Sequence, residues 1–201
     1  MFLPIINGIV TEKKMYNKKN IIKKSIIRKR GKKMSALELA QMKELELCMD
    51  IIEEGKKFQK EQGFTQWTDD YPNIDTIRSD IQNAKGYVIK VDDRIAGYMC
   101  IDFDGEPAYT NIQGAWRAEA PYAVIHRMAF QKGFRGIGLT GIAFALIEKL
   151  CIQKGIYYLR VDTDFPNKRM QHILKKNGFV HCGNIVFQGG EKLAFDKLLF
   201  A

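Results

Sequence analysis

A glycine-rich turn between a strand-like and a helix-like stretch contains the residue types best suited to chemistry in this sequence. Residues 122–130 read as a strand, glycines recur over 133–138, and an apolar stripe at helical spacing follows over 142–150. A helix start has backbone N–H groups without internal partners and a partial positive charge, so anions bind there. Arg135 adds a guanidinium whose planar fork suits phosphate oxygens. The turn therefore predicts a phosphorylated ligand.

Two widespread phosphate-binding patterns can be compared with this turn. The Walker pattern G-x-x-x-x-G-K-[ST] matches residues 133–140, except that Leu139 replaces the lysine that reaches the outer phosphates. The dinucleotide pattern G-x-G-x-x-G fits residues 136–141, with Asp162 or Asp164 near the expected distance for a ribose contact. That pattern normally opens a βαβ domain from an uncharged strand, whereas this strand carries a histidine and an arginine and lies late in the chain.

A third pattern, [QR]-x-x-G-x-[GA] after a strand, is the acyl-CoA loop of the GNAT superfamily of N-acetyltransferases. The sequence resembles it at Arg135, Gly138 and Thr140, although Thr140 departs from the small residue at the final position. Asn167 and the Gly-Phe pair at 178–179 resemble that superfamily's Asn…Gly-Phe segment, in the expected order. Two ordered motifs favour this family over the dinucleotide loop. The resemblance covers the C-terminal part of the chain, and the part before it agrees in element order.

The resemblance implies that acetyl-CoA is the cosubstrate. Its diphosphate would lie on the amides of residues 136–140, and its pantetheine arm would pair with the strand beside it as an added strand does. Asn167 would hydrogen-bond that arm; the alternative is that Asn167 caps a helix. The expected cofactor-binding residues are Met128, Ala129, Phe130, Arg135, Gly136, Ile137, Gly138, Leu139, Thr140 and Asn167.

Transfer to an amine needs a deprotonated nucleophile, a stabilised oxyanion and a proton for the departing thiolate. The backbone N–H of Met128 can donate to the oxyanion. His126 is the candidate general base, because strand alternation places it on the face of Met128 and Phe130 and because the ordinary histidine pKa lies near neutrality. The alternative is a histidine hydrogen-bonded within the sheet. Leu174 stands where many relatives have the tyrosine that protonates the thiolate, so a nearby side chain or solvent must supply that proton.

Four aromatic residues in or beside long connections are expected to wall the acceptor pocket, because specificity usually lies in such segments. They are Trp67, Tyr71, Tyr109 and Trp116. The alternative is that they plug the ends of the sheet. A metal site is not expected, because the four cysteines are scattered and form no C-x-x-C pair. Unpaired cysteines in apolar contexts also favour a reducing cytoplasm.

The formal charge of +9 is concentrated at the N-terminus. Residues 1–33 hold eleven of the 32 Lys and Arg and only one of the 23 acidic residues, so the remaining chain is nearly neutral. We expect 1–33 to be a disordered basic extension or the product of an upstream start site, and 34–201 to be one domain. The folded domain is not expected to bind nucleic acid. No apolar stretch has the ~20 residues of a membrane span.

Hydrophobic periodicity predicts the element order β-α-α-β-β-β-α-β-α-β-β. Helices divided among strands favour an α/β fold with a mixed sheet and helices on both faces. The resemblance further implies a mostly antiparallel, twisted sheet whose strands at 122–130 and 157–163 splay apart around the thioester. A terminal strand at 193–200, if exposed, could pair between subunits and form a homodimer.

The most economical interpretation is an N-acetyltransferase that moves the acetyl group of acetyl-CoA to a primary amine of a small molecule or peptide. One alternative is a non-catalytic acyl-CoA-binding domain, because the usual acid is missing. A dinucleotide-binding protein is the other alternative.

Overall fold

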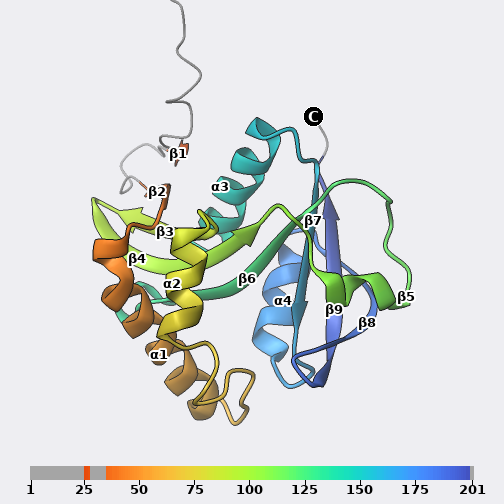
Figure 1. Ribbon diagram of the computed structural model, residues 1–201, viewed down its shortest axis with the longest axis horizontal. Coiled ribbons are helices and arrows are strands. Elements are labelled where there is room, and N and C mark those ends of the chain that lie inside the picture. The colour runs from red at the N-terminus through yellow and green to blue at the C-terminus, as the bar shows by residue number, and fades with distance from the viewer. Residues whose placement is uncertain (1–24, 28–34, 200–201) are drawn as a thin grey trace, which may run out of the picture.

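The computed structural model describes residues 25–27 and 35–199, and most of the basic extension at 1–33 lies outside them. Within the described residues, nine strands form a single sheet on which four α-helices pack (Figure 1). The strands are β1 (Ser25–Ile27), β2 (Ser35–Leu39), β3 (Gly86–Val91), β4 (Arg94–Asp102), β5 (Gln113–Gly114), β6 (Ala123–Phe130), β7 (Tyr158–Thr163), β8 (Val180–Phe187) and β9 (Gly190–Leu198). The helices are α1 (Leu45–Glu61), α2 (Ile74–Gln82), α3 (Leu139–Gln153) and α4 (Lys168–Lys176).

The strands lie in the order β1-β2-β3-β4-β6-β7-β9-β8-β5. Neighbouring strands are antiparallel, except that β6 and β7 are parallel. The expected mixed, mostly antiparallel sheet is therefore confirmed. The terminal strand does not offer a free edge, however, because β9 is hydrogen-bonded to β7 on one side and β8 on the other. The expectation that this strand pairs between subunits is therefore wrong.

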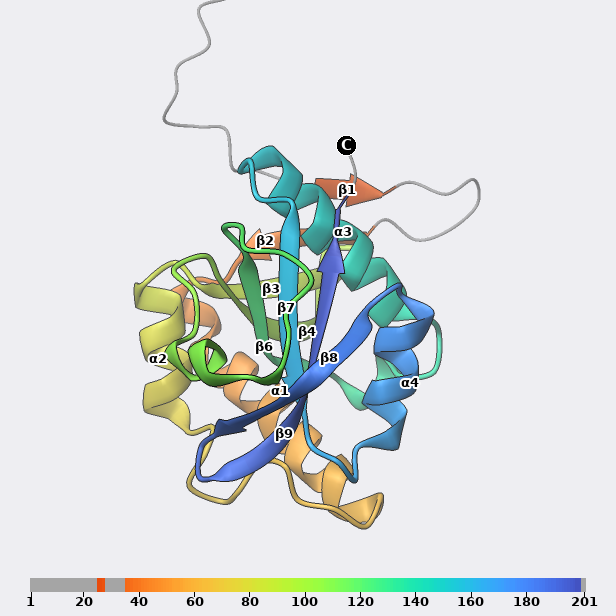
Figure 2. The same ribbon diagram turned by 90° about the vertical axis from the view of Figure 1, so that its right-hand side faces the viewer.

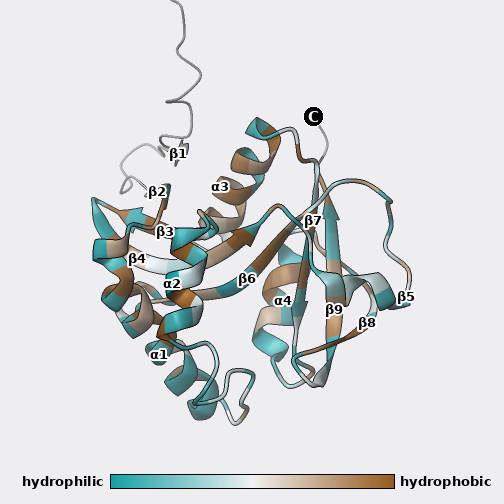
Figure 3. Cartoon of the chain, in the orientation of Figure 1, coloured by the Kyte–Doolittle hydropathy of each residue, from teal (hydrophilic) through white to brown (hydrophobic). Residues whose placement is uncertain are grey.

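Helices cover both faces of the sheet, as expected. Residues of α1 and α2 form one apolar cluster with Val88, Tyr98 and Ala129, and residues of α3 and α4 form a second with Tyr87 and Ile89. Adjacent residues of β3 thus point to opposite layers, as strand geometry requires. Figure 2 shows α2 on one side of the strands and α3 and α4 on the other. In Figure 3, α1 and α2 carry both teal and brown bands, as expected for helices that bury one face.

The sheet splits between β6 and β7. The two strands pair only at Ala123 with Leu159 and at Val124 with Arg160. Beyond these pairs, β6 continues beside β4 and β7 continues beside β9. The expected splay between the strands at 122–130 and 157–163 is therefore confirmed, and it leaves space between the later halves of the two strands.

A β-bulge interrupts β6 within its splayed half. His126 pairs with Cys100 and Ala129 pairs with Tyr98, so β6 places two residues opposite the single residue between them on β4. The first of the two, Arg127, has a left-handed φ of 53°, and the bulge shifts the alternation of side chains by one residue.

The consequence is a correction to the expected position of His126. Met128 and Phe130 pack with the α3 cluster, whereas His126 lies across from Cys100, next to Arg127, whose side chain reaches α2. His126 therefore does not share a face with Met128 and Phe130. The bulge that causes this could not be recognised from alternation alone.

Candidate functional site

A cavity of about 430 Å³ lies beside the glycine turn. Residues of α1, β6, the turn, the start of α3 and α4 line it. Of the ten expected cofactor-binding residues, nine are among its lining residues: Met128, Ala129, Phe130, Arg135, Gly136, Gly138, Leu139, Thr140 and Asn167. The tenth, Ile137, has 62% of its surface exposed and is not part of the lining.

Two glycines give the turn its shape. Gly136 and Gly138 have left-handed φ values of 80° and 79°, and Gly138 is the N-cap residue of α3. A Cβ at either position would meet no atom within 4 Å, so backbone conformation rather than crowding favours glycine there. No side chain of the described residues caps α3. The first N–H groups of α3 are therefore left to an external acceptor beside the cavity.

The guanidinium of Arg135 is held by contacts within the protein, unlike that of an arginine that is free to bind a phosphate. Its Nε donates to the carbonyl of Phe130 at 2.9 Å, and its Nη2 donates to the carbonyl of Glu54 at 3.0 Å. The guanidinium also stacks on Phe58, 4.8 Å from the ring centroid. Arg135 thus joins α1, the end of β6 and the turn, and its main role in this structure is to hold the loop in place.

Two exposed cations from α4 line the same cavity and were missed by sequence reasoning. Arg169 and Lys176 lie two helical turns apart, so their side chains project from one side of α4. The guanidinium of Arg169 lies 5.3 Å from the centroid of Phe58. Their spacing on a basic helix was the available signal, but it only becomes informative once α4 is placed against the turn.

Asn167 caps α4, which was the structural alternative for this residue. Its Oδ1 accepts from the backbone N–H of Met170 at 3.1 Å. Its Nδ2 donates to Oε1 of Gln66 at 2.9 Å, and that oxygen also accepts from the hydroxyl of Thr163. Asn167 therefore links the loop after α1 to the start of α4 while it lines the cavity.

A second, narrower cavity of about 80 Å³ occupies the splay between β6 and β7. It shares five lining residues with the larger cavity: Gln59, Trp67, Met128, Asn167 and Met170. The two cavities therefore meet beside the bulge of β6. This arrangement joins a larger space beside the start of α3 to a smaller space between the splayed strands.

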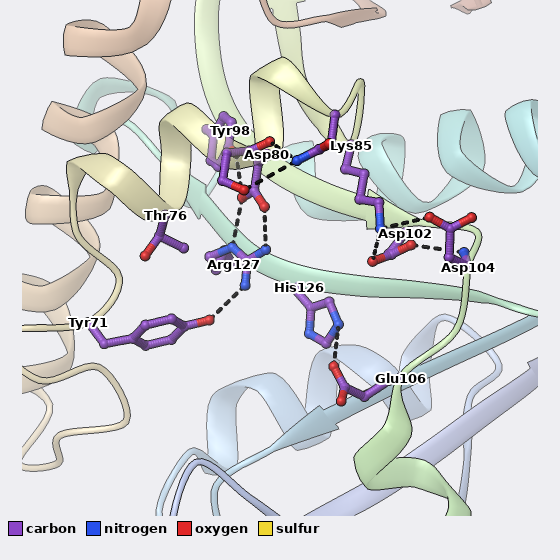
Figure 4. A network of polar contacts seen from close by, with 12 residues as sticks. Tyr71, Thr76, Asp80, Lys85, Tyr98, Asp102, Asp104, Glu106, His126 and Arg127 are labelled. Carbon is purple, nitrogen blue, oxygen red and sulfur yellow. Dashed lines mark hydrogen bonds and ion pairs between the residues drawn. The ribbon is translucent and has the colours of Figure 1, made fainter.

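His126 lines the narrow cavity, but its surroundings do not favour a base that titrates near neutrality. Its Nε2 lies 3.6 Å from Oε2 of Glu106 (Figure 4), and its side chain is 9% exposed. Burial lowers the pKa of His126 to about 3, and the charge of Arg127 contributes in the same direction. The imidazole is consequently uncharged at neutral pH, and it is a poor proton acceptor there.

A buried polar network holds the bulge in place (Figure 4). Arg127 binds both carboxylate oxygens of Asp80, with Nε to Oδ2 at 2.9 Å and Nη2 to Oδ1 at 2.7 Å. Its Nη1 donates to the hydroxyl of Tyr71 at 2.6 Å, and the hydroxyl of Tyr98 donates to Asp80 at 2.8 Å. The left-handed residue of the bulge is thus tied to α2, β4 and the loop after α1.

Asp162 lines the narrow cavity with its carboxyl group, and sequence reasoning did not assign it to catalysis. It lies on β7, and Tyr109 donates its hydroxyl to Oδ1 at 2.7 Å. Burial raises the pKa of Asp162 to about 6, although the hydrogen bond from Tyr109 and the charge of Lys192 act in the opposite direction. Asp162 therefore titrates closer to neutrality than an ordinary carboxyl group.

The four expected aromatic residues divide into two pairs. Trp67 lines both cavities and Tyr71 lines the narrow one. Tyr109 is 1% exposed behind Asp162, and Trp116 donates its indole N–H to the carbonyl of Tyr109 and covers Arg160. The second pair therefore packs in an apolar cluster with Val124, Ile185 and Ala194 and does not wall either cavity.

Among the described residues, no group of three His, Cys, Asp or Glu side chains is arranged to hold a metal ion. None of the helices within 35–199 combines the length and apolar character needed to cross a membrane.

Comparisons with known proteins agree with this arrangement. The model of the acetyltransferase (GNAT) family matches residues 46–179. A GNAT-family acetyltransferase from Streptococcus agalactiae 2603 is 32% identical with a TM-score of 0.75, over 83% of this chain and 96% of that chain. Another from Listeria monocytogenes 4b F2365 is 22% identical with a TM-score of 0.69, over 87% of this chain and 100% of that chain.

A third structure, of the microcin C7 self-immunity acetyltransferase MccE, contains acetyl-CoA and AMP. It is 18% identical with a TM-score of 0.57, over 82% of this chain and 92% of that chain, and it shows a shared fold. No curated protein matches the chain. Because the family model spans most of the domain and contains both the glycine turn and the Gly-Phe pair, the chain belongs to the GNAT family of acetyltransferases.

Proposed function

We propose that this protein transfers the acetyl group of acetyl-CoA to a primary amine of a small molecule or peptide by direct attack. The observation that carries the proposal is the meeting of two cavities beside the bulge of β6, one next to a helix start and the other lined by the carboxylate of Asp162. The acetyl-CoA bound by the fold relative MccE supports the choice of donor. The four cysteines are free, which supports a reducing cytoplasm as the compartment.

The donor would occupy the larger cavity. Its diphosphate would accept hydrogen bonds from the N–H groups of residues 136–140, and Arg169 and Lys176 would add positive charge from α4. The pantetheine arm would run along the splayed half of β6, where the partner strand β7 has moved away. The thioester would then reach the junction of the two cavities.

The bulge would place the oxyanion donor at that junction. Met128 lines both cavities and immediately follows the left-handed residue Arg127. The backbone N–H of Met128 would donate to the oxygen of the tetrahedral intermediate as charge develops on it. Leu174, at the position of the tyrosine acid of many relatives, is fully buried in the apolar core. The thiolate therefore takes its proton from the attacking amine or from solvent.

The proposal is tested by measuring free CoA with a thiol reagent after incubation with acetyl-CoA and a panel of primary amines. The panel should include diamines, amino sugars and peptides with free N-termini. Amine-dependent release of CoA is the expected result. Stabilisation by acetyl-CoA in a thermal-shift assay without release to any amine would favour the non-catalytic alternative, and stabilisation by NAD alone would favour a dinucleotide site.

A further inference from the structure

We propose that Asp162 is the general base that accepts the proton of the acceptor amine. This inference rests on the proposed acetyl transfer to an amine. Asp162 lines the narrow cavity from β7, whereas Met128 lines it from β6. It lies two residues beyond Arg160, the last residue of β7 that pairs with β6. Its carboxylate is therefore located where the two strands have separated and an acceptor can enter between them.

Among the described residues, one hydrogen bond orients the carboxylate of Asp162 and engages only one of its two oxygens. Tyr109 donates to Oδ1 and is itself held in place by packing against Trp116 at 5.2 Å between ring centroids. Within the described part of the chain, no hydrogen bond forms to Oδ2. Lys192, the nearest cation of β9, is bound to Asp164 at 2.5 Å rather than to Asp162. One oxygen of Asp162 is thus free to accept a proton or hydrogen-bond an ammonium group.

The other polar residues of this region fit the role less well. Glu106 does not line the narrow cavity, and its Oε1 already accepts from the N–H of Ala108 at 3.1 Å. His126 has a pKa of about 3 and is too weak a base at neutral pH. Arg127 is committed to Asp80. Asp162 is therefore the ionisable group of the cavity whose basicity and free oxygen both suit proton transfer.

The surroundings explain why this carboxylate is a better base than an exposed one. Burial disfavours the charged form and raises the pKa of Asp162 to about 6, and the negative charges of Asp164 and Glu106 add to this effect. The hydroxyl of Tyr109 and the ammonium group of Lys192 act in the opposite direction. Across the cavity on β6, His126 is uncharged at neutral pH, and the positive charge of Arg127 is paired with the negative charge of Asp80.

The proposed step balances in protons and electrons. The ammonium group of the acceptor gives one proton to Oδ2 of Asp162, which later releases it to solvent. The neutral nitrogen attacks the carbonyl carbon of acetyl-CoA, and the oxyanion accepts a hydrogen bond from Met128. When the tetrahedral intermediate collapses, the C–S bond breaks, the nitrogen loses its second proton, and the CoA thiolate gains one. The products are the acetylated amine, CoA and one proton.

The decisive comparison is between Asp162→Asn and Glu191→Gln. Both variants remove one carboxylate from this part of the sheet, but Glu191 is exposed on β9 and does not line either cavity. We expect Asp162→Asn to lower kcat by ~100-fold or more, as loss of a general base typically does, and Glu191→Gln to have a much smaller effect. Acetyl-CoA should still stabilise both variants in a thermal-shift assay, which verifies that the protein is folded and that the donor site is intact.

A second measurement separates proton transfer from a structural role. The wild-type rate should fall on the acid side with an apparent pKa near 6. Tyr109→Phe should move that limb to higher pH, because it removes a hydrogen bond that favours the carboxylate. If the wild type releases CoA but Asp162→Asn is within a few fold of it, or if Tyr109→Phe leaves the limb in place, the base assignment is wrong and acetyl transfer stands. If the wild type acetylates no amine, the proposed function itself fails.

Discussion

Arg127 and Asp80 form a two-pronged ion pair that is almost completely removed from solvent and joins the bulge of β6 to α2. Their side chains are 11% and 9% exposed, and both guanidinium–carboxylate hydrogen bonds are shorter than 3.0 Å. Arg127 is also the residue with the left-handed backbone, directly before the proposed oxyanion donor Met128. The pair therefore couples the geometry of the reaction centre to a helix on the other layer of the fold.

Asp80→Asn is expected to destabilise the protein and to lower turnover. It leaves the guanidinium of Arg127 buried without its counter-charge, which typically costs ~3–5 kcal/mol of the free energy of unfolding. Urea denaturation followed by circular dichroism measures this loss. The matched control is Asp75→Asn, which removes an exposed carboxylate that pairs with Arg78 on the same helix and should change stability little. Equal effects of the two substitutions would contradict a structural role for the buried pair.

Gly138→Ala is expected to weaken the binding of acetyl-CoA. An alanine in the left-handed conformation at the N-cap of α3 costs ~1–2 kcal/mol, and relief of that strain would turn the first N–H groups of α3 away from the ligand. Isothermal titration calorimetry with acetyl-CoA measures the affinity.

Gly133→Ala is the control for this substitution. Gly133 lies in the same turn, but its backbone is not left-handed and a Cβ there would meet no atom within 4 Å. It should leave the affinity nearly unchanged. The proposed role of the turn would be wrong if Gly133→Ala weakened binding as much as Gly138→Ala.

The proposed donor half of the site could be predicted because most of it is local. The turn, the start of α3 and the preceding strand are consecutive, and eight of the nine expected residues around the larger cavity lie within 128–140. The ninth, Asn167, and the assignment of all nine to acetyl-CoA came from the family resemblance. The proposed acceptor half is assembled from β6, β7, β9 and the loop after α1, and no local pattern connects Asp162, Lys192 and Tyr71.

The error over His126 has a specific physical origin. A strand of alternating side chains predicts a common face for residues 126, 128 and 130, but a single left-handed residue at Arg127 shifts the pattern. What stabilises that conformation is Asp80, which is distant in sequence. A non-glycine residue with positive φ has no reliable local signature, so the bulge becomes visible only with the tertiary structure.

Lys176→Ala is expected to reduce the affinity for acetyl-CoA several-fold and to weaken the salt dependence of binding. Lys176 is exposed at the edge of the larger cavity, where its ammonium group can attract a phosphate. Its neighbour Lys175 is also exposed but does not line the cavity, so Lys175→Ala is a control with the same change in net charge. Titrations at low and high salt distinguish a local contact from a general charge effect. If both variants lose affinity equally, Lys176 makes no specific contact.

The low pKa of His126 predicts how stability depends on pH. With a pKa of about 3 in the folded protein and 6.5 in the unfolded chain, the unfolded state binds a proton that the folded state excludes between these values. Stability therefore falls as the pH is lowered through this window, and from pH 7.5 to 5 the histidine should cost ~2 kcal/mol. The raised pKa of Asp162 acts with the opposite sign between 3.8 and about 6, so the two effects must be separated by substitution.

The substitution His126→Gln removes the contribution of the histidine to the pH dependence of stability and retains the contribution of Asp162. Urea denaturation at pH 5 and 7.5 should show that wild type loses ~2 kcal/mol more than His126→Gln on acidification, because the glutamine cannot be protonated. Ile147→Val is the control, since this side chain is fully buried on α3 in the other layer and has no titrating group. It should lower stability equally at both pH values. Parallel losses in wild type and His126→Gln would show that the imidazole is as easily protonated in the folded protein as in the unfolded chain, and the assignment of a neutral, buried His126 would be wrong.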